Sequence, residues 1–443
     1  MISVIKRATS SKFVRNVAIV ATGTAGAQAI IMAFAPIITR LYGPEAFGVL
    51  GTFTAILAVI MPLAAFSYPV AIVLPKHDAD ARGLAKLSIK IAAITCLLVS
   101  IVLLVFKTQL VNAFNLQEIE SFVLLLPVAM LFSACMSIMS QWVVRKKLFK
   151  IKAKIAVLQA LWVNSAKAGV GLFFPVATFL IILSTLGGAL HALMLWNATR
   201  KSAVENIMNV GNSDKVNITK QRELAWKYRD FVYYRTPQVL FNTASANFPV
   251  IILASLFGTS VAGFYALARM ALSVPSKLIS KSITTVFYPK ITEVINARGD
   301  AKGLIIKATL ALALLNIVPY GIIVAFGPTI FSFVFGEEWF VAGEYARWMS
   351  IFLFAAFITG PSIAALPALS KQGFFLSFEI FSFIVRMGAI YLGYRITGSD
   401  ILTVAILSIT GFFIKLLLPV FTVFFAQTAY QDNVKADAGS YSE

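Results

Sequence analysis

Long apolar runs separated by short polar segments fill most of this chain of 443 residues. An α-helix needs about 20 apolar residues to cross the hydrocarbon core of a bilayer, and the runs have that length. The pattern predicts an all-α integral membrane protein of about twelve transmembrane helices. The fifth and sixth runs nearly merge, so a count of eleven is also compatible with the pattern. The expected spans lie near residues 17–39, 46–70, 87–106, 121–144, 154–174, 177–198, 236–257, 261–287, 303–326, 345–367, 374–395 and 401–425.

Composition favours the same class of protein. Apolar residues make up 59% of the chain, charged residues make up 13%, and the mean hydropathy is +0.84. A soluble domain carries roughly 25% charged residues because its surface faces water. The first apolar run, from Val17 to Thr39, is longer than the ~7–15 apolar residues of a cleaved signal peptide. We therefore expect this run to be retained as the first helix.

Positive charges gather on one side of the expected topology. With the N-terminus inside, 28 of the 38 Lys and Arg residues fall in cytoplasmic segments and four fall in outer loops. Because Lys and Arg accumulate in cytoplasmic loops, both termini of this multi-pass protein should be cytoplasmic. The net charge of +19 then reflects membrane topology, and no basic soluble module points to nucleic acid as a partner.

Two short motifs recur at nearly the same offset. Residues 41–49 match residues 256–264 at an offset of 215, and residues 82–86 match residues 298–302 at an offset of 216. A shared offset indicates duplication of a six-helix unit, which gives two pseudo-symmetric parallel lobes. The expected division is an N-terminal lobe over 1–198, a cytoplasmic linker over 199–235, a C-terminal lobe over 236–425 and a cytoplasmic tail over 426–443.

Six cationic side chains lie inside the expected helices. An ionisable group there costs about 2.5–3.5 kcal/mol on insertion scales, so it normally faces a partner or a water-filled cavity. Glu379 is the one clear acidic residue within these spans, so internal pairing cannot neutralise all six cations. We therefore expect a cavity that binds an anionic ligand. Its candidate residues are Lys167, Arg269, Lys277, Lys281, Arg386 and Lys415.

Snorkelling of long side chains to the interface is the alternative for these cations. It suits Lys281, near the inner end of its helix, whereas Arg269 and Arg386 lie well inside their spans. Uncharged polar residues at helical spacing agree with a wet interior, with hydrogen bonding between helices as the alternative. The candidate polar lining consists of Gln28, Gln141, Gln238 and Asn242.

Motifs along essentially the whole chain are familiar. They include Arg40-Leu41-Tyr42-Gly43-Pro44-Glu45-Ala46-Phe47-Gly48 and, over the most specific stretch at 227–300, Lys227-Tyr228-Arg229-Asp230-Phe231, Gly263-Phe264-Tyr265-Ala266-Leu267-Ala268-Arg269 and Phe287-Tyr288-Pro289. Together they resemble the bacterial polysaccharide transporter family. These are Wzx-type flippases of the MOP superfamily, which also includes MATE-type multidrug exporters.

The resemblance implies two six-helix lobes that enclose a central cationic cavity. It implies transport of undecaprenyl-pyrophosphate-linked oligosaccharide, such as the O-antigen unit of lipopolysaccharide, from the inner to the outer leaflet of the bacterial inner membrane. Alternating access would be driven by an H⁺ or Na⁺ gradient, without a cofactor, and Glu379, Glu45 and Arg40 are candidates for coupling or gating. A polysaccharide polymerase and chain-length proteins are candidate partners.

Other functions remain open. A MATE-type drug/cation antiporter needs acidic groups in its cavity, whereas the embedded charges here are almost all positive. A lipid II flippase generally carries helices beyond twelve. A membrane polymerase or glycosyltransferase needs a large outer loop, and the longest one expected here covers only 327–344. No catalytic or metal motif is present, because the only histidines are His77 and His191 and no P-loop or H-E-x-x-H occurs. We therefore expect a transporter, not an enzyme.

Overall fold

Every element in the described part of the chain is a helix, which confirms the expected all-α membrane fold. The computed structural model describes the backbone of residues 12–207, 218–297 and 299–440, and side chains at 19–200, 221–273, 287–297, 299–428 and 431. The elements are α2 (Lys12–Ala64), α3 (Tyr68–Ala71), α4 (Asp78–Ala113), η1 (Gln117–Leu125), α5 (Leu126–Arg145), α6 (Phe149–Gly171), α7 (Ala177–Ile207), α8 (Ile218–Lys227), η2 (Phe231–Arg235), α9 (Thr236–Phe257), α10 (Thr259–Asn296), α11 (Ala301–Phe335), η3 (Glu337–Trp339), α12 (Phe340–Ile358), α13 (Gly360–Ala368), α14 (Gln372–Thr397) and α15 (Asp400–Ser440).

Nine helical segments within the described ranges are long and apolar enough to cross a bilayer. One of them, in α2, covers two of the expected spans. The backbone at Gly43 (φ 68°, ψ 172°) is not helical, so this segment consists of two helices joined at a kink. Helices α6 and α10 coincide with two further expected spans, and α6 ends before α7 begins, so the fifth and sixth runs do not merge. The count of twelve transmembrane helices stays a prediction.

The outer faces of these helices are apolar. Leu97 and Leu98 on α4 are exposed, as is Leu314 on α11, and Phe333 is 81% exposed. Large apolar patches are rare on soluble proteins because they are unfavourable in water, whereas lipid solvates them. The chain is thus a multi-pass membrane protein.

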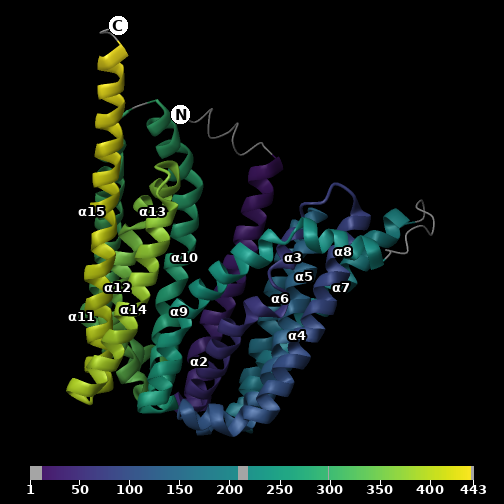
Figure 1. The fold of residues 1–443 in the computed structure, drawn as a ribbon. Helices are drawn as coiled ribbons and strands as arrows, with labels where there is room; N and C mark the ends of the chain where they lie inside the picture. Colours follow the sequence, from purple (N-terminus) through teal and green to yellow (C-terminus); the bar gives the residue numbers. More distant parts are fainter. Residues whose placement is uncertain (1–11, 208–217, 298, 441–443) are drawn as a thin grey trace. The chain divides into compact units, whose positions relative to one another are not determined.

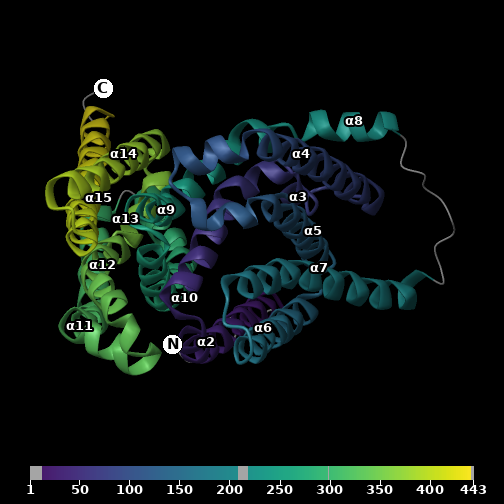
Figure 2. The same ribbon diagram turned by 90° about the horizontal axis from the view of Figure 1, so that it is seen from below.

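The chain divides into two compact units, unit 1 (Met1–Gly263) and unit 2 (Phe264–Glu443). In unit 1, α2 packs along α6 and α5 packs along α7 (Figures 1 and 2). In unit 2, α12 packs against both α11 and α15, and α14 packs against α15. The expected lobe boundaries stay predictions.

Part of the expected linker over 199–235 packs onto unit 1. Helix α8 lies against α4 (Figure 2), and its Leu224 is buried in a cluster with Tyr68 of α3 and Ile138 of α5. The Tyr68 hydroxyl donates to the carbonyl of Ala225 at 3.1 Å. The last expected linker residues form the π-helical turn η2, which leads directly into α9.

The two copies of the repeated motif share a backbone conformation. Gly43 has φ 68° and ψ 172°, and Gly258, at the matching position, has φ 93° and ψ 170°. Positive φ combined with ψ near 180° is essentially restricted to glycine. The next glycine of each copy allows close packing. A Cβ on Gly48 would lie 1.8 Å from the carbonyl oxygen of Thr259, and one on Gly263 would lie 2.2 Å from that of Pro44.

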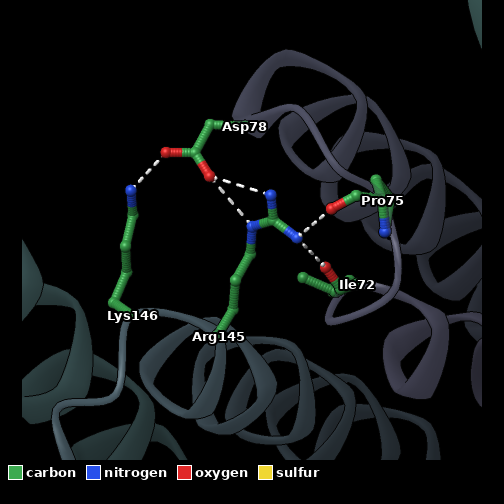
Figure 3. A network of polar contacts seen from close by, with 5 residues as sticks. All are labelled: Ile72, Pro75, Asp78, Arg145 and Lys146. Carbon is green, nitrogen blue, oxygen red and sulfur yellow. Dashed lines mark hydrogen bonds and ion pairs between the residues drawn. The ribbon is translucent and has the colours of Figure 1, made fainter.

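Arg145, at the end of α5, holds the segment between α3 and α4 (Figure 3). Its guanidinium donates to the carbonyl oxygens of Pro75 at 2.7 Å and Ile72 at 3.3 Å, and to Asp78 Oδ1 at 2.9 and 3.0 Å. The Lys146 ammonium pairs with the other oxygen of Asp78 (Figure 3). Asp78 begins α4, where a carboxylate also interacts favourably with the helix dipole. The Arg145 side chain thus forms hydrogen bonds with two carbonyl oxygens and with the carboxylate of Asp78, the first residue of α4.

We expect Arg145→Ala to destabilise unit 1 by about 2–3 kcal/mol, because hydrogen bonds to charged groups are worth about 1.5–3 kcal/mol. The melting temperature of the purified protein in detergent measures the effect. Lys150→Ala is the control, because Lys150 is an exposed cation on the neighbouring helix α6. Equal melting temperatures for the two variants would contradict the structural role of Arg145.

The prediction of an outer loop over 327–344 is wrong, because most of these residues are helical. Helix α11 continues to Phe335, η3 and Gly336 form the turn, and α12 begins at Phe340. Gly327-Pro328 suggests a break because such pairs end helices in soluble proteins. In a membrane helix neighbouring helices satisfy the freed backbone groups, so Gly and Pro are tolerated there. The pair instead allows close packing, since a Cβ on Gly343 would lie 2.4 Å from the Cα of Pro328.

Candidate functional site

The ammonium of Lys415 forms an ion pair with the carboxylate of Glu379, at 2.6 Å between Nζ and Oε1. Lys415 lies on α15 and Glu379 on α14, and their side chains are 11% and 33% exposed. Glu379, the one clear acidic residue within the expected spans, therefore neutralises Lys415, which is one of the six embedded cations. A buried ion pair of this kind gains little net stability, but the loss of either partner leaves an uncompensated charge.

Arg386 lies two turns further along α14, on the same face as Glu379. Its Cζ atom lies 4.5 Å from the centre of the Phe352 ring on α12. Its Nε atom is buried and has no hydrogen-bond partner. Gly411 of α15 makes room for both side chains, because a Cβ there would lie 2.6 Å from Phe352 and 3.5 Å from Arg386 Nε. Three helices of unit 2 thus enclose a guanidinium with an unused donor.

Arg269 and Tyr265 on α10 complete the surroundings of Arg386. Both residues, like Glu379, lie close enough to the guanidinium to interact with it electrostatically. Tyr265 is buried and Arg269 is partly exposed. Unit 2 thus brings together Arg269, Arg386, Lys415 and Glu379 of the sequence-predicted site. Lys277 and Lys281 lie outside the described side chains.

We expect Glu379→Gln to destabilise unit 2 by about 3–5 kcal/mol, because it leaves the buried ammonium of Lys415 unpaired, and Lys415→Met to destabilise it less, because the Glu379 carboxylate is one-third exposed. The double variant removes both charges, so it should be clearly more stable than the sum of the two single effects predicts. Thermal unfolding of the four proteins in one detergent measures the coupling. Additive effects would show that the ion pair does not exist in the folded protein.

Unit 1 holds the predicted site residues up to Gly263, and those of the expected cavity lie on four different helices. Lys167 is partly exposed on α6, where its carbonyl accepts a hydrogen bond of 2.8 Å from the Tyr42 hydroxyl. Gln28 and Gln141 are partly exposed on α2 and α5, and Gln238 and Asn242 are exposed on α9. Their role as a polar lining stays a prediction.

The two predicted gating residues of unit 1 flank the break in α2. Arg40 and Glu45 are both exposed, on either side of Gly43. Glu45 lies near the carboxylate of Glu118 on η1, which accepts a hydrogen bond from the Thr259 hydroxyl. The repeated motif and the start of η1 thus form one polar cluster at this end of unit 1. A gating role for Arg40 and Glu45 stays a prediction.

Sequence analysis missed Arg235, the last residue of η2. It lies on the wall of a cavity in unit 1. The hydropathy pattern assigns it to the cytoplasmic linker over 199–235, because it precedes the apolar run of α9. Its position beside Thr236-Pro237, where that helix begins, is the signal that could have identified it.

The group in unit 2 has the chemistry of an anion site. A guanidinium presents its donors in a planar fork that matches phosphate and carboxylate oxygens, and it keeps its charge in apolar surroundings. The Lys415–Glu379 pair engages one of the predicted cations of unit 2, and the buried Nε atom of Arg386 has no hydrogen-bond partner among the described residues.

Comparison with solved structures identifies the class of fold. An inward-facing multidrug resistance MATE family transporter of the MOP superfamily superimposes with a TM-score of 0.69 at 13% sequence identity, over 91% of this chain and 96% of that chain. The lipid II flippase MurJ, in an inward closed conformation, gives a TM-score of 0.66 at 13% identity, over 94% and 90%. The chain therefore has the MATE/MOP-type fold.

Sequence comparison defines the family. Residues 37–343, more than half of the chain, match the family model described as "Polysaccharide biosynthesis protein". The chain belongs to this family, which confirms the resemblance seen in its motifs. A search of curated protein sequences gives no match.

Proposed function

We propose that this protein is a flippase for undecaprenyl-pyrophosphate-linked oligosaccharide, the O-antigen unit of lipopolysaccharide or a similar surface-polysaccharide unit. It moves this lipid from the inner to the outer leaflet of the bacterial inner membrane by alternating access. Membership of the polysaccharide biosynthesis family and a fold similar to that of transporters support this proposal. Both termini are cytoplasmic in the proposed orientation, as the distribution of Lys and Arg favours.

The guanidinium of Arg386, whose Nε atom is buried, carries the proposal. Its unpaired Nε donor in an apolar helix bundle is unfavourable, because a buried unsatisfied donor costs about 1–3 kcal/mol, and more when it is charged. A diphosphate that reached this side chain would complete its hydrogen bonds and share its charge with Arg269. Arg386 and Arg269 would therefore bind the diphosphate, while the sugars contact uncharged polar residues.

The Lys415–Glu379 pair supplies a means of coupling to an ion gradient. Protonation of Glu379, or binding of Na⁺ to it, would release the ammonium of Lys415. The freed cation would add to the positive charge around Arg386 and favour the diphosphate. Transport then requires no catalytic residue and no cofactor, and a polymerase and chain-length proteins would take up the product at the outer leaflet.

A MATE-type drug/cation antiporter is the second candidate, because such a transporter shares the fold. It needs an acidic group free to bind a cationic drug, whereas Glu379 is paired with Lys415. The family match also favours a polysaccharide substrate over a drug.

Transport in vesicles separates the two functions. Purified protein is reconstituted with fluorescent polyprenyl-diphosphate oligosaccharide, and a membrane-impermeant quencher reports how much label changes leaflet. Parallel vesicles contain a fluorescent cationic drug, and each set is run with and without an H⁺ or Na⁺ gradient. We expect gradient-dependent movement of the lipid alone. Movement of the drug alone would overturn the proposal.

A further inference from the structure

Unit 1 contains a cavity of about 400 Å³ that no predicted site residue lines. Its wall is built from the second half of α2, from α3, and from α5, η2 and α9. Apolar residues such as Met61, Pro62 and Val239 dominate the wall, with the hydroxyls of Ser67, Ser137 and Thr243 between them. Arg235 is the one charged residue of the described lining, so the cavity is apolar with a single cationic side.

The backbone around this cavity departs from regular helix on two sides. Phe66 and Ser67, between α2 and α3, have φ values of 45° and 58°, a left-handed conformation that is unfavourable for an aromatic residue. Residues Phe231–Arg235 form a π-helical turn, which is a rare element that occurs frequently at functional sites. The expected second span over 46–70 therefore ends early, at Ala64, because the chain breaks here.

Hydrogen bonds hold the two irregular segments together. The Thr236 hydroxyl lies 3.0 Å from the Ser67 hydroxyl and also 3.0 Å from the carbonyl oxygen of Phe231. Arg145 holds the chain directly after α3 through the carbonyl of Ile72. Strained backbone persists only where its surroundings hold it in place, and it marks functional sites. These hydrogen bonds therefore fix the backbone of the cavity wall on which Arg235 lies.

Arg235 is free to bind a ligand. Its side chain is exposed, and within the described residues no ion pair or hydrogen bond engages its guanidinium. The adjacent rings of Tyr233 and Tyr234 are 66% and 75% exposed. Tyrosines of this kind sit at the membrane interface, where the ring contacts acyl chains and the hydroxyl contacts water. The Arg235 side of the cavity thus has the character of the head-group region.

The size of the cavity limits its occupant. A volume of about 400 Å³ holds roughly thirteen groups of the size of water, at about 30 Å³ each. The cavity is open on one side, and its volume is enough to hold one branched hydrocarbon chain of two or three isoprene units. The cavity also falls within the range of about 300–1,000 Å³ typical of small-ligand sites.

We propose that this cavity binds the phosphate end of a single-chain polyprenyl lipid, with the phosphate on Arg235 and the first isoprene units against Met61, Pro62 and Val239. The residues that line this site belong to unit 1 and none of them is part of the Arg386 group, and the proposal rests on the proposed function only for the identity of the lipid. It would hold the lipid at the inner leaflet, because Arg235 ends the segment over 199–235 that the cation distribution assigns to the cytoplasmic side.

Photolabelling in detergent tests the binding without any transport step. The probe is farnesyl phosphate with a photoreactive group on its chain, applied to the full-length protein, and labelled peptides are identified by mass spectrometry. We expect labels on α2 and α9 at the cavity wall. Arg235→Gln should reduce this labelling at least tenfold, whereas Arg222→Gln, which removes an exposed cation of α8, should leave it unchanged.

A second pair of variants tests the cavity and not the charge. Ala58→Phe places a ring in the cavity and should abolish labelling, whereas Thr54→Phe, one turn away at an exposed position outside the lining, should not. Thermal unfolding of each variant confirms that it is folded.

Two competition arms distinguish the sources of the ligand. The proposal requires that photoreactive farnesol, which lacks the phosphate, labels the wall weakly, and that phosphatidylglycerol competes poorly. Equal labelling by farnesol, or full competition by phosphatidylglycerol, would overturn it, and so would labelling unaffected by Arg235→Gln and Ala58→Phe. If the labelling is as expected but the protein transports no lipid-linked oligosaccharide, the binding site is supported and only the proposed function is refuted.

Discussion

Arg386→Ala should reduce the transport of polyprenyl-diphosphate oligosaccharide by about 100-fold or more. A bidentate contact between a guanidinium and a diphosphate contributes two charge-assisted hydrogen bonds, together about 3–5 kcal/mol, and each 1.4 kcal/mol is a factor of ten. The variant should still fold, because the substitution removes a buried donor that has no partner in the ligand-free protein. Initial rates of leaflet exchange in vesicles, at equal amounts of reconstituted protein, measure the loss.

Two further variants make this prediction specific. Arg386→Lys keeps the charge and loses the planar fork, so its rate should fall between those of the wild type and Arg386→Ala. Arg395→Ala removes an exposed arginine from the last turn of the same helix, α14, and its rate should stay within about twofold of the wild type. If Arg386→Ala and Arg395→Ala transported equally well, Arg386 would have no part in binding the substrate.

Gly48→Ala should prevent normal folding of unit 1. The added Cβ would lie 1.8 Å from the carbonyl oxygen of Thr259, which is a backbone atom and cannot rotate away. Overpacking of a core costs about 1–3 kcal/mol and occasionally more, and a clash with backbone belongs at the upper end of that range. Gly263→Ala should behave in the same way, because its Cβ would meet the carbonyl of Pro44. The yield of monodisperse protein and its melting temperature in detergent measure the effect.

Gly169→Ala is the matched control for these two substitutions. Gly169 lies within α6, and a Cβ there meets no atom within 4 Å. Because alanine favours helix by about 1 kcal/mol over glycine, this variant should be as stable as the wild type or slightly more stable. A wild-type melting temperature for Gly48→Ala would mean that the two copies of the repeated motif do not pack closely.

The fold was largely predictable because apolar length and periodicity are strong signals in a membrane protein. The expected spans at 154–174, 236–257 and 374–395 coincide closely with α6, α9 and α14. The errors fall where Gly and Pro act differently in lipid than in water, as at Gly327-Pro328 in α11. The early end of the second span could not be predicted, since nothing in the local pattern marks the left-handed residues Phe66 and Ser67.

The candidate site was predictable as a list of charges and not as an arrangement. Hydropathy identified Arg386, Lys415 and Glu379 as embedded, because such residues stand out in apolar runs. The pairing of Lys415 with Glu379 depends on the packing of α14 against α15, which helical spacing alone does not give. Arg235 was missed because it stands at the boundary of an apolar run, where a cation is ordinary.

Dependence on the head group tests the central claim most directly. Vesicles with the wild-type protein receive two fluorescent lipids that share the oligosaccharide and the polyprenyl chain, one linked through a diphosphate and the other through a neutral ether. If the embedded cations select the diphosphate, the first lipid should change leaflet at least tenfold faster than the second, and Arg386→Ala should remove most of the difference. Equal rates for the two lipids in wild-type vesicles would contradict the account.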